Sequence, residues 1–207
     1  MTLINIINVG LGNLASLRNW CRLSQKEVRL LEHPLDYQSG AIIIPGVCCA
    51  GTLMLRLRKA GFDKLIYEVE KSQQKVLGIC AGFQVLGTFT EEAGGVGCLG
   101  LLPIETSKST PSSDKDSRLT GWFRVSISLP KSQPVSRDFP RKTCITGEAY
   151  FNHQYIAKAL SLESTSGDVV SYRSDFVTCF IRNSIYGFQF HPEKSASFGR
   201  RLLAILK

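Results

Sequence analysis

The sequence predicts an α/β fold in a single domain. Continuous apolar runs, which are typical of buried parallel strands, alternate with helical patterns in the first part of the chain. Beyond a polar segment at 107–118 the chain becomes rich in strand patterns. The length of 207 residues fits one domain with a substantial core, and neither a repeat nor a linker divides the chain. We therefore expect one domain over residues 1–207.

The elements of the first part follow from apolar runs that end at turn residues. In chain order we expect a strand at 3–9, a helix from Leu14 to Leu23, strands at 28–31 and 41–45, a helix at 53–71 and a strand at 75–79. Glycines at Gly10, Gly12 and Gly46 turn the chain after the first and third strands. This order is an α/β pattern built from right-handed crossovers.

The second part is predicted to contain strands and one last helix. The polar segment 107–118 is expected to be an exposed loop. Strands are expected at 122–129, 144–151, 169–172, 176–182 and 185–190. The final helix, 197–207, places Phe198, Leu202, Ile205 and Leu206 on one face.

Composition and charge favour a soluble protein that binds neither membranes nor nucleic acids. Hydrophobic residues make up 43% and charged residues 20% of the chain, which is ordinary for a globular protein. No apolar run approaches the roughly 20 residues that span a bilayer. The first residues lack the features of a secretory signal, so we expect a cytoplasmic protein. The net charge is +8, but the basic residues are dispersed and not interleaved with aromatic residues.

The cysteines indicate neither a disulfide framework nor a zinc site. There are seven, an odd number, and no Cys-x-x-Cys pair is present. We expect most of them to be small buried hydrophobic residues and treat Cys80 as the exception. No metal cluster, Walker loop or complete dinucleotide fingerprint is present, so no cofactor is expected.

Cys80 has the sequence context of a nucleophile. It lies between Gly78 and Gly82, where an apolar run ends and a helical pattern begins. This is the thiol form of the Gly-x-Ser-x-Gly nucleophile elbow. The tight turn needs glycines because a side chain at either flank would collide with the neighbouring backbone. The nearby helix N-terminus favours the thiolate.

A second motif supplies a base and a group to orient it. His191 follows an apolar strand and precedes Pro192, which fixes the local backbone. Glu193 lies two residues further on, so in an extended segment its side chain leaves on the same side as His191. Together with Cys80 these residues form a candidate Cys-His-Glu triad.

Other polar residues allow more than one interpretation. His33 lies in a predicted loop and needs no functional role. His153 could lie near the site, although a structural or interface role is favoured over it. Gln84 comes one helical turn after Cys80 and faces the same side. It could bind substrate or cap locally, and substrate binding is favoured.

The candidate residues should meet at one edge of the sheet. The turn at 10–13, Gly46, Cys80 and His191 all come directly after predicted strands. In open α/β sheets, ligands bind beyond the carboxyl ends of the strands. A thiol nucleophile with a base there suits an amide or ester acyl donor, through attack, loss of amine and hydrolysis.

At these residues the chain resembles the class I, triad-type glutamine amidotransferases. It is most similar to the HisH glutaminase subunits of imidazole glycerol phosphate synthase. The resemblance extends from end to end. It is carried by the turn at 10–13, Pro45-Gly-Val47, the elbow with Gln84, Glu91-Glu92, Gly121-Trp122, Tyr150-Phe151-x-His153 and the segment 189–195.

The resemblance implies a three-layer, flavodoxin-like fold with a mixed, mostly parallel sheet and helices on both faces. It implies that Cys80 forms a glutamyl thioester, His191 acts as base and Glu193 orients it. It also implies that L-glutamine is the substrate and that ammonia passes to a HisF-type (β/α)8-barrel synthase. The remaining assignments that it implies are an oxyanion strand at Gly46 and Val47, glutamine contacts at Gln84 and Glu92, and a partner interface at Asn13, Trp122 and Lys194.

Some positions depart from the family pattern. Asn8 and Val9 replace the usual Asp-Tyr before Gly10, and Cys48 replaces the last glycine of Pro-Gly-Val-Gly. A glycine there allows a peptide flip that completes the oxyanion hole, and a side chain restricts it. Three alternatives to a subunit for histidine biosynthesis therefore stay open. They are a paralogue that supplies ammonia for surface-polysaccharide nucleotide sugars, a non-catalytic partner of the synthase, and a stand-alone cysteine hydrolase.

Overall fold

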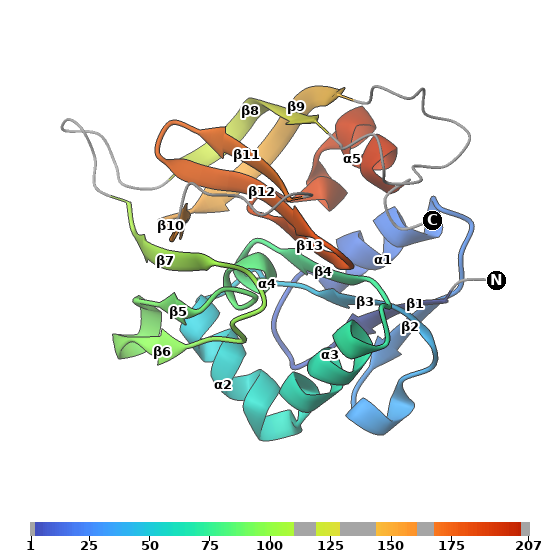
Figure 1. The fold of residues 1–207 in the computed structure, drawn as a ribbon. Helices are drawn as coiled ribbons and strands as arrows, with labels where there is room; N and C mark the ends of the chain where they lie inside the picture. Colours follow the sequence, from blue (N-terminus) through green and yellow to red (C-terminus); the bar gives the residue numbers. More distant parts are fainter. Residues whose placement is uncertain (1–2, 110–118, 129–143, 161–167, 204–207) are drawn as a thin grey trace.

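The structure of the protein is a computed structural model that describes residues 3–109, 119–128, 144–160 and 168–203 (Figure 1). Three sheets and the surrounding helices make up this part of the chain. None of its helices is long and apolar enough to cross a membrane.

The main sheet has seven strands in the order β11-β12-β13-β4-β3-β1-β2. Their bounds are β1 Leu3–Ile7, β2 Val28–Leu31, β3 Gly40–Ile44, β4 Val76–Ile79, β11 Val169–Arg173, β12 Phe176–Arg182 and β13 Ile185–Phe188. The pairs β2–β1, β1–β3, β3–β4 and β4–β13 are parallel, whereas β12 pairs antiparallel with both of its neighbours. The sheet is therefore mixed and mostly parallel, as predicted.

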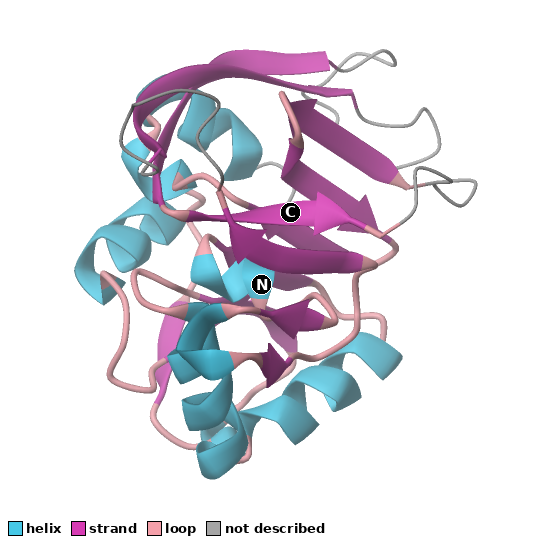
Figure 2. Cartoon of the chain, turned by 90° about the vertical axis from the view of Figure 1, so that its left-hand side faces the viewer, coloured by secondary structure: helices cyan, strands magenta, loops and turns pink. Residues whose placement is uncertain are grey.

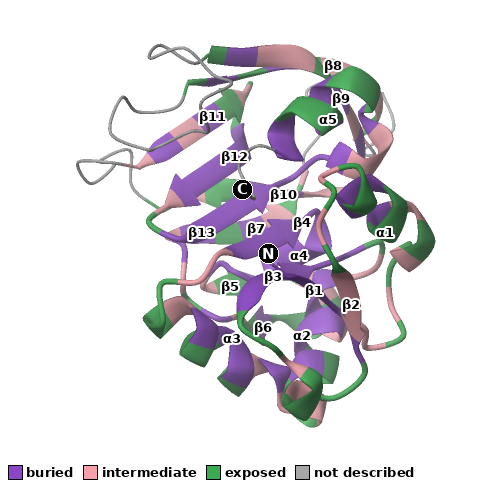
Figure 3. Cartoon of the chain, turned by 90° about the vertical axis from the view of Figure 1, so that its right-hand side faces the viewer, coloured by how far each residue is buried: buried purple, intermediate pink, exposed green. Residues whose placement is uncertain are grey.

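Helices cover both faces of this sheet. Helices α1 (Leu14–Arg22) and α5 (Ala196–Leu202) pack on one face, while α2 (Ala50–Ala60) and α3 (Phe62–Lys71) cover the other (Figures 1 and 2). Alternate strand residues point to opposite faces, so Ile43 joins the core below α1 whereas Ile42 and Ile44 join the core below α2. Buried strands enclosed by partly exposed helices are visible in Figure 3.

Two smaller sheets flank the main one. The first has the order β10-β7-β5-β6 and contains β5 Phe89–Thr90, β6 Val96–Gly97, β7 Ile104–Lys108 and β10 Tyr155–Ala159. The second is the antiparallel pair of β8 (Leu119–Ser128) and β9 (Cys144–His153), which lies over α5 and the edge strand β11. The long pairing of β8 with β9 carries the chain toward the carboxyl edge of the main sheet, where β9 ends at His153.

The predicted α/β class is confirmed, with local corrections. The helix expected at 53–71 is two helices, because Gly61 adopts the left-handed conformation (φ 79°) and ends α2. The strand expected at 3–9 ends at Ile7, and the Asn8 side chain instead accepts a hydrogen bond from the Gly10 N–H. Residues 107 and 108 belong to β7 rather than to a loop, while 110–118 and 204–207 lie outside the described residues.

Candidate active site

The carboxyl edge of the main sheet brings Cys80 and His191 together. Strands β4 and β13 are parallel neighbours, and Ile79 pairs with Phe188. The backbone N–H of Cys80 donates a hydrogen bond to the Phe188 carbonyl oxygen at 2.7 Å. Cys80 and His191 therefore follow adjacent strand ends, so the convergence predicted from the sequence is confirmed.

Cys80 has the strained backbone of a nucleophile elbow. Its φ of 53° and ψ of −110° lie between β4 and the short helix α4, Ala81–Gln84. A non-glycine residue rarely adopts a positive φ, and such strain is typical of functional sites. The turn places Cys80 at the carboxyl edge of the sheet, where 5% of the residue is exposed.

The elbow requires glycine at positions 78 and 82 because a side chain would not fit at either position. A Cβ atom at Gly78 would lie 2.4 Å from the Gly82 carbonyl oxygen. A Cβ atom at Gly82 would lie 1.9 Å from the Ile44 carbonyl oxygen at the end of β3. Both contacts are with backbone, which cannot move aside, so the steric reason inferred from the sequence is confirmed.

This crowding predicts a large loss of stability for Gly82→Ala. We expect the free energy of unfolding to fall by about 3 kcal/mol, because the new methyl group must push two chain segments apart. The matched control is Gly97→Ala, since a Cβ at Gly97 meets nothing within 4 Å. Urea unfolding of both variants measures the difference, and equal stabilities would contradict the prediction.

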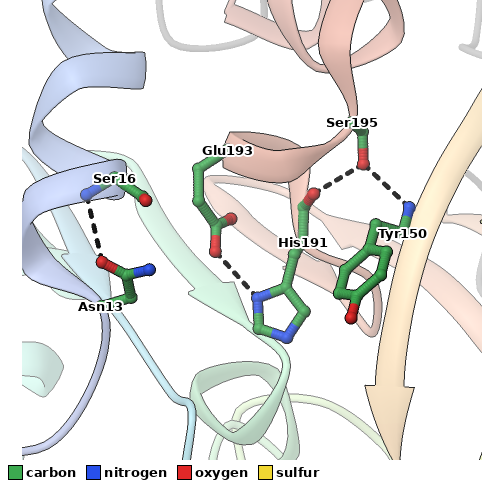
Figure 4. A network of polar contacts seen from close by, with 6 residues as sticks. All are labelled: Asn13, Ser16, Tyr150, His191, Glu193 and Ser195. Carbon is green, nitrogen blue, oxygen red and sulfur yellow. Dashed lines mark hydrogen bonds and ion pairs between the residues drawn. The ribbon is translucent and has the colours of Figure 1, made fainter. Parts of the chain in front are cut away.

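His191 and Glu193 form a buried pair next to Cys80, the predicted nucleophile. The Nδ1 atom of His191 lies 2.8 Å from Glu193 Oε1, and the two side chains are 1% and 4% exposed. Ser195 holds the segment in place (Figure 4): its hydroxyl donates to the His191 carbonyl at 2.6 Å and accepts from the Tyr150 N–H at 3.0 Å. The Nε2 atom of His191 is buried and has no well-formed hydrogen bond, which leaves it available to a reacting group.

The imidazole is held in its protonated form at neutral pH. Burial lowers the pKa of His191, but the hydrogen bonds and negative charges of Cys80 and Glu193 outweigh it and raise this pKa to about 10. Nδ1 then donates to Glu193, which is the contact that the predicted orienting role of this carboxylate requires.

This raised pKa predicts a pH-dependent contribution to folding. A proton bound more tightly in the folded state stabilises it fully below the ordinary histidine pKa of about 6.5, and this stabilisation is lost as the pH rises toward about 10. The difference in unfolding free energy between the natural protein and His191→Asn should therefore decrease from pH 7 to pH 10. Denaturant unfolding at several pH values tests this, and a constant difference would contradict it.

A cavity of about 290 Å³ opens at Cys80. Its lining residues are Val47, Cys48, Cys49, Cys80, Gln84, Glu92, Asn152, His153, Gln154 and Tyr155. The structure thus brings together the predicted nucleophile, part of the predicted oxyanion strand and both predicted glutamine contacts. Gly46 lies behind the cavity, where a Cβ atom would be 2.5 Å from the Gly82 nitrogen.

Gln84 and Glu92 line this cavity but also make structural hydrogen bonds. The Gln84 Nε2 atom donates to the Tyr155 carbonyl at 3.0 Å and to Gln189 Oε1 at 3.3 Å. The Glu92 carboxylate accepts from the Ala50 N–H at the start of α2 and from the Cys49 thiol. Both residues shape the wall of the cavity, and direct contact with glutamine stays a prediction.

His153 lies at the cavity and also packs in the core. Its ring lines the cavity, is 8% exposed, and packs against Phe151 and Phe176 with centroid distances of 5.8 and 5.7 Å. Burial lowers the pKa of His153 to about 4; the Tyr155 backbone opposes this shift and His191 reinforces it. Neither ring nitrogen has a well-formed hydrogen bond. A neutral imidazole is therefore part of the cavity wall, with both ring nitrogens buried, which the strand pattern alone could not reveal.

We expect His153→Phe to weaken substrate binding more than chemistry. Phenylalanine fills the same space but offers no hydrogen bond, so KM for glutamine should rise about tenfold or more, with a smaller change in kcat. Steady-state kinetics measure both constants. A fall in kcat at unchanged KM would contradict this role.

Two of the three predicted interface residues meet on one surface. The Trp122 ring, 61% exposed, lies 4.8 Å from the Tyr150 ring, and the Lys194 Nζ lies 5.2 Å from the same ring. Asn13 caps α1 by accepting from the Ser16 N–H at 3.2 Å (Figure 4). An exposed aromatic ring and a partly exposed lysine beside the buried pair of His191 and Glu193 suit a partner surface, but that function stays a prediction.

The described part of the chain contains no cluster of side chains suited to binding a metal ion. No group of three or more His, Cys, Asp or Glu side chains there could hold a metal ion. The groups that acyl transfer needs are a thiol that lines the cavity, Cys80, and the pair of His191 and Glu193, which lies beside Cys80 but outside the cavity lining.

Comparison with known proteins agrees with this chemistry. The family described as CobB/CobQ-like glutamine amidotransferase domain matches residues 2–123. The "Imidazole glycerol phosphate synthase subunit HisH" of Dehalococcoides mccartyi (strain CBDB1) is 34% identical over 201 residues, covering 97% of this chain and 94% of that protein. The protein of the same name from Moorella thermoacetica is 33% identical over 205 residues, covering 99% and 92%.

Solved structures of low sequence identity share the fold. A glutamine amidotransferase crystal structure superposes with a TM-score of 0.70 at 15% identity, covering 98% of this chain and 97% of that chain. A chain of PurLQS from Thermotoga maritima gives 0.69 at 13% identity, covering 99% and 97%. The three-layer fold implied by the resemblance is thereby confirmed. The chain therefore belongs to the class I glutamine amidotransferases, enzymes that hydrolyse glutamine, and it groups with relatives named HisH.

Proposed function

We propose that this chain is the glutaminase subunit of an imidazole glycerol phosphate synthase in histidine biosynthesis. In this proposal Cys80, His191 and Glu193 hydrolyse glutamine, and the ammonia passes to a HisF-type (β/α)8-barrel subunit. The functional unit is the whole of residues 1–207, acting in the cytoplasm. The names of the relatives support the pathway, and the comparisons do not favour the surface-polysaccharide alternative.

One observation carries the catalytic part. The imidazole of His191 is fixed by Glu193 at 2.8 Å, and its interaction with Cys80 raises its pKa. A strained thiol, an oriented imidazole and a cavity at the thiol are the three parts that covalent acyl transfer needs. The intact arrangement argues against the non-catalytic alternative.

The first half of the reaction forms a thioester. The Cys80 thiolate attacks the side-chain carbonyl carbon of glutamine, which creates a C–S bond and an oxyanion. When this intermediate collapses, the C–N bond breaks and His191 gives its proton to the leaving nitrogen. Ammonia departs, and a glutamyl thioester stays on Cys80.

The second half releases glutamate. The neutral His191 removes a proton from water, whose oxygen attacks the thioester carbonyl. The C–S bond then breaks, so Cys80 leaves as the thiolate and His191 is again protonated. Glu193 keeps Nδ1 protonated throughout, which directs Nε2 at the reacting atoms.

The oxyanion needs donors that the elbow and the oxyanion strand supply. The backbone N–H of the residue after the nucleophile, here Ala81, has this role in nucleophile elbows. Val47 is the second contributor through its backbone, since it lines the cavity beside Cys80. Cys48 limits the backbone freedom of this segment, so we expect the partner to be required for full activity.

The test is glutamate release by the purified chain with and without a co-expressed HisF-type subunit. We expect low turnover alone and a strong increase in the complex, with ammonia incorporated into imidazole glycerol phosphate. A stand-alone hydrolase would be favoured if turnover were equal with and without the partner and if substrates other than glutamine were also hydrolysed. Trp122→Ala should weaken assembly, whereas Leu35→Ala, which removes an 88% exposed leucine elsewhere, should not.

A further inference from the structure

The cavity at Cys80 contains a second thiol that the glutaminase mechanism does not use. Cys48 and Cys80 line the same space of about 290 Å³, and both are free cysteines. Cys48 is half-buried and Cys80 is 5% exposed. A nucleophilic side chain at the wall of a thiol active site needs an explanation beyond packing.

The fold holds Cys48 next to the nucleophile. Strands β3 and β4 are parallel neighbours in which Ile44 pairs with Gly78, so the segments that carry Cys48 and Cys80 leave the sheet side by side. A Cβ atom at Gly46 would lie 2.5 Å from the Ala81 Cβ and 2.5 Å from the Gly82 nitrogen. The two backbones are thus already in contact two residues before Cys48.

The effect of Cys80 on the pKa of Cys48 is consistent with two neighbouring thiols. Burial, followed by the charge on Cys80, raises the pKa of Cys48 to about 12, while Arg56 opposes this shift. The Cys48 thiol is therefore protonated at neutral pH. The neighbouring Cys49 thiol instead makes a hydrogen bond to Glu92, which leaves Cys48 as the thiol that can turn to Cys80.

We propose that Cys48 is a resolving cysteine that captures the oxidised nucleophile as a reversible Cys48–Cys80 disulfide. The inference rests on the proposed role of Cys80 as the reactive thiolate. The disulfide would switch the glutaminase off under oxidation by a peroxide and protect Cys80 from irreversible damage. Reduction by a dithiol restores both thiols.

The chemistry needs one peroxide for each disulfide. The Cys80 thiolate attacks one peroxide oxygen, the O–O bond breaks, and the departing hydroxide takes the proton of the His191 imidazolium as water, giving a sulfenic acid. The Cys48 sulfur then attacks the Cys80 sulfur, so an S–S bond forms and the S–O bond breaks. The departing hydroxide takes the Cys48 proton as water. Two thiols are oxidised and one peroxide is reduced to two waters.

The experiment compares three full-length proteins treated with hydrogen peroxide in thiol-free buffer. Unreduced digests are mapped by mass spectrometry, and glutamate release is measured before and after dithiothreitol. In the natural protein we expect a crosslink between the Cys48 and Cys80 peptides and recovery of activity on reduction. In Cys48→Ser we expect sulfinic acid at Cys80 and at least about tenfold less recovered activity, because nothing resolves the sulfenic acid.

Cys49→Ser is the matched control, since it removes a thiol from the same cavity but should keep the crosslink and the recovery. Sulfinic acid at Cys80 in the natural protein without a crosslink, or a crosslink that uses Cys49, would overturn the proposal. The crosslink is detected without glutamine. If the disulfide forms but the protein never releases glutamate, the proposed function is refuted while the disulfide proposal stands.

Discussion

Cys80→Ala is expected to reduce glutamate release by at least about 10⁴-fold, because it removes the sulfur that forms the thioester beside His191. Cys80 has the strained φ of 53° that aims its side chain out of the elbow. Alanine accepts this backbone no worse than cysteine does, so folding and partner binding should persist. Glutamate release and the unfolding midpoint are measured on the same preparation.

The control for this variant is Cys98→Ala. Cys98 is a half-buried thiol outside the cavity lining, whose Sγ donates to the Val96 carbonyl at 3.6 Å. The glutaminase activity of Cys98→Ala should stay within about twofold of that of the natural protein. Cys80→Ala with more than a tenth of the natural activity would remove Cys80 from the mechanism.

His191→Asn is expected to lower kcat by about 10⁴-fold, because both proton transfers pass through the imidazole. Asparagine cannot carry the proton that the leaving nitrogen requires. The burst of ammonia in the first turnover should be lost together with steady-state release, since thioester formation itself needs this proton. Rapid-quench ammonia measurements separate the two stages.

His33→Asn provides the matched control, since it makes the same replacement at an exposed histidine. His33 caps the 3₁₀ helix Pro34–Asp36 by accepting from the Leu35 N–H at 3.2 Å, and asparagine is also a good N-cap. Unchanged kinetics are expected. A slow initial burst that survives in His191→Asn would assign the first proton transfer to another group.

The sequence was most informative where local sterics determine the structure. The elbow could be predicted because Gly78 and Gly82 leave no room for a side chain, and the distances to backbone confirm this reason. The convergence of Cys80 with His191 followed from the carboxyl ends of parallel strands, which share one edge. The contact between His191 and Glu193 was expected from an extended segment, and this reason was wrong: Pro192–Lys194 form a 3₁₀ helix, which still brings Glu193 Oε1 to 2.8 Å from His191 Nδ1.

Features that depend on long-range pairing escaped prediction. Strand β10 pairs with β7, which lies far away in the chain, and β5 is only two residues long. The inward position of His153 depends on the register of β9 with β8, which a strand pattern does not specify. The end of α2 at Gly61, by contrast, depends on local sequence. A glycine that follows the basic residues Arg58 and Lys59 is a typical helix end and could have been predicted.

The most direct test of the central claim is to identify the covalent intermediate. The natural protein in complex with its synthase partner is mixed with glutamine, quenched in acid within one turnover, digested and mapped by mass spectrometry. We predict a glutamyl group on Cys80 and on no other cysteine, absent from Cys80→Ala. Glutamate release with Cys80 unmodified at every time point, or a glutamyl group on another cysteine, would contradict the account.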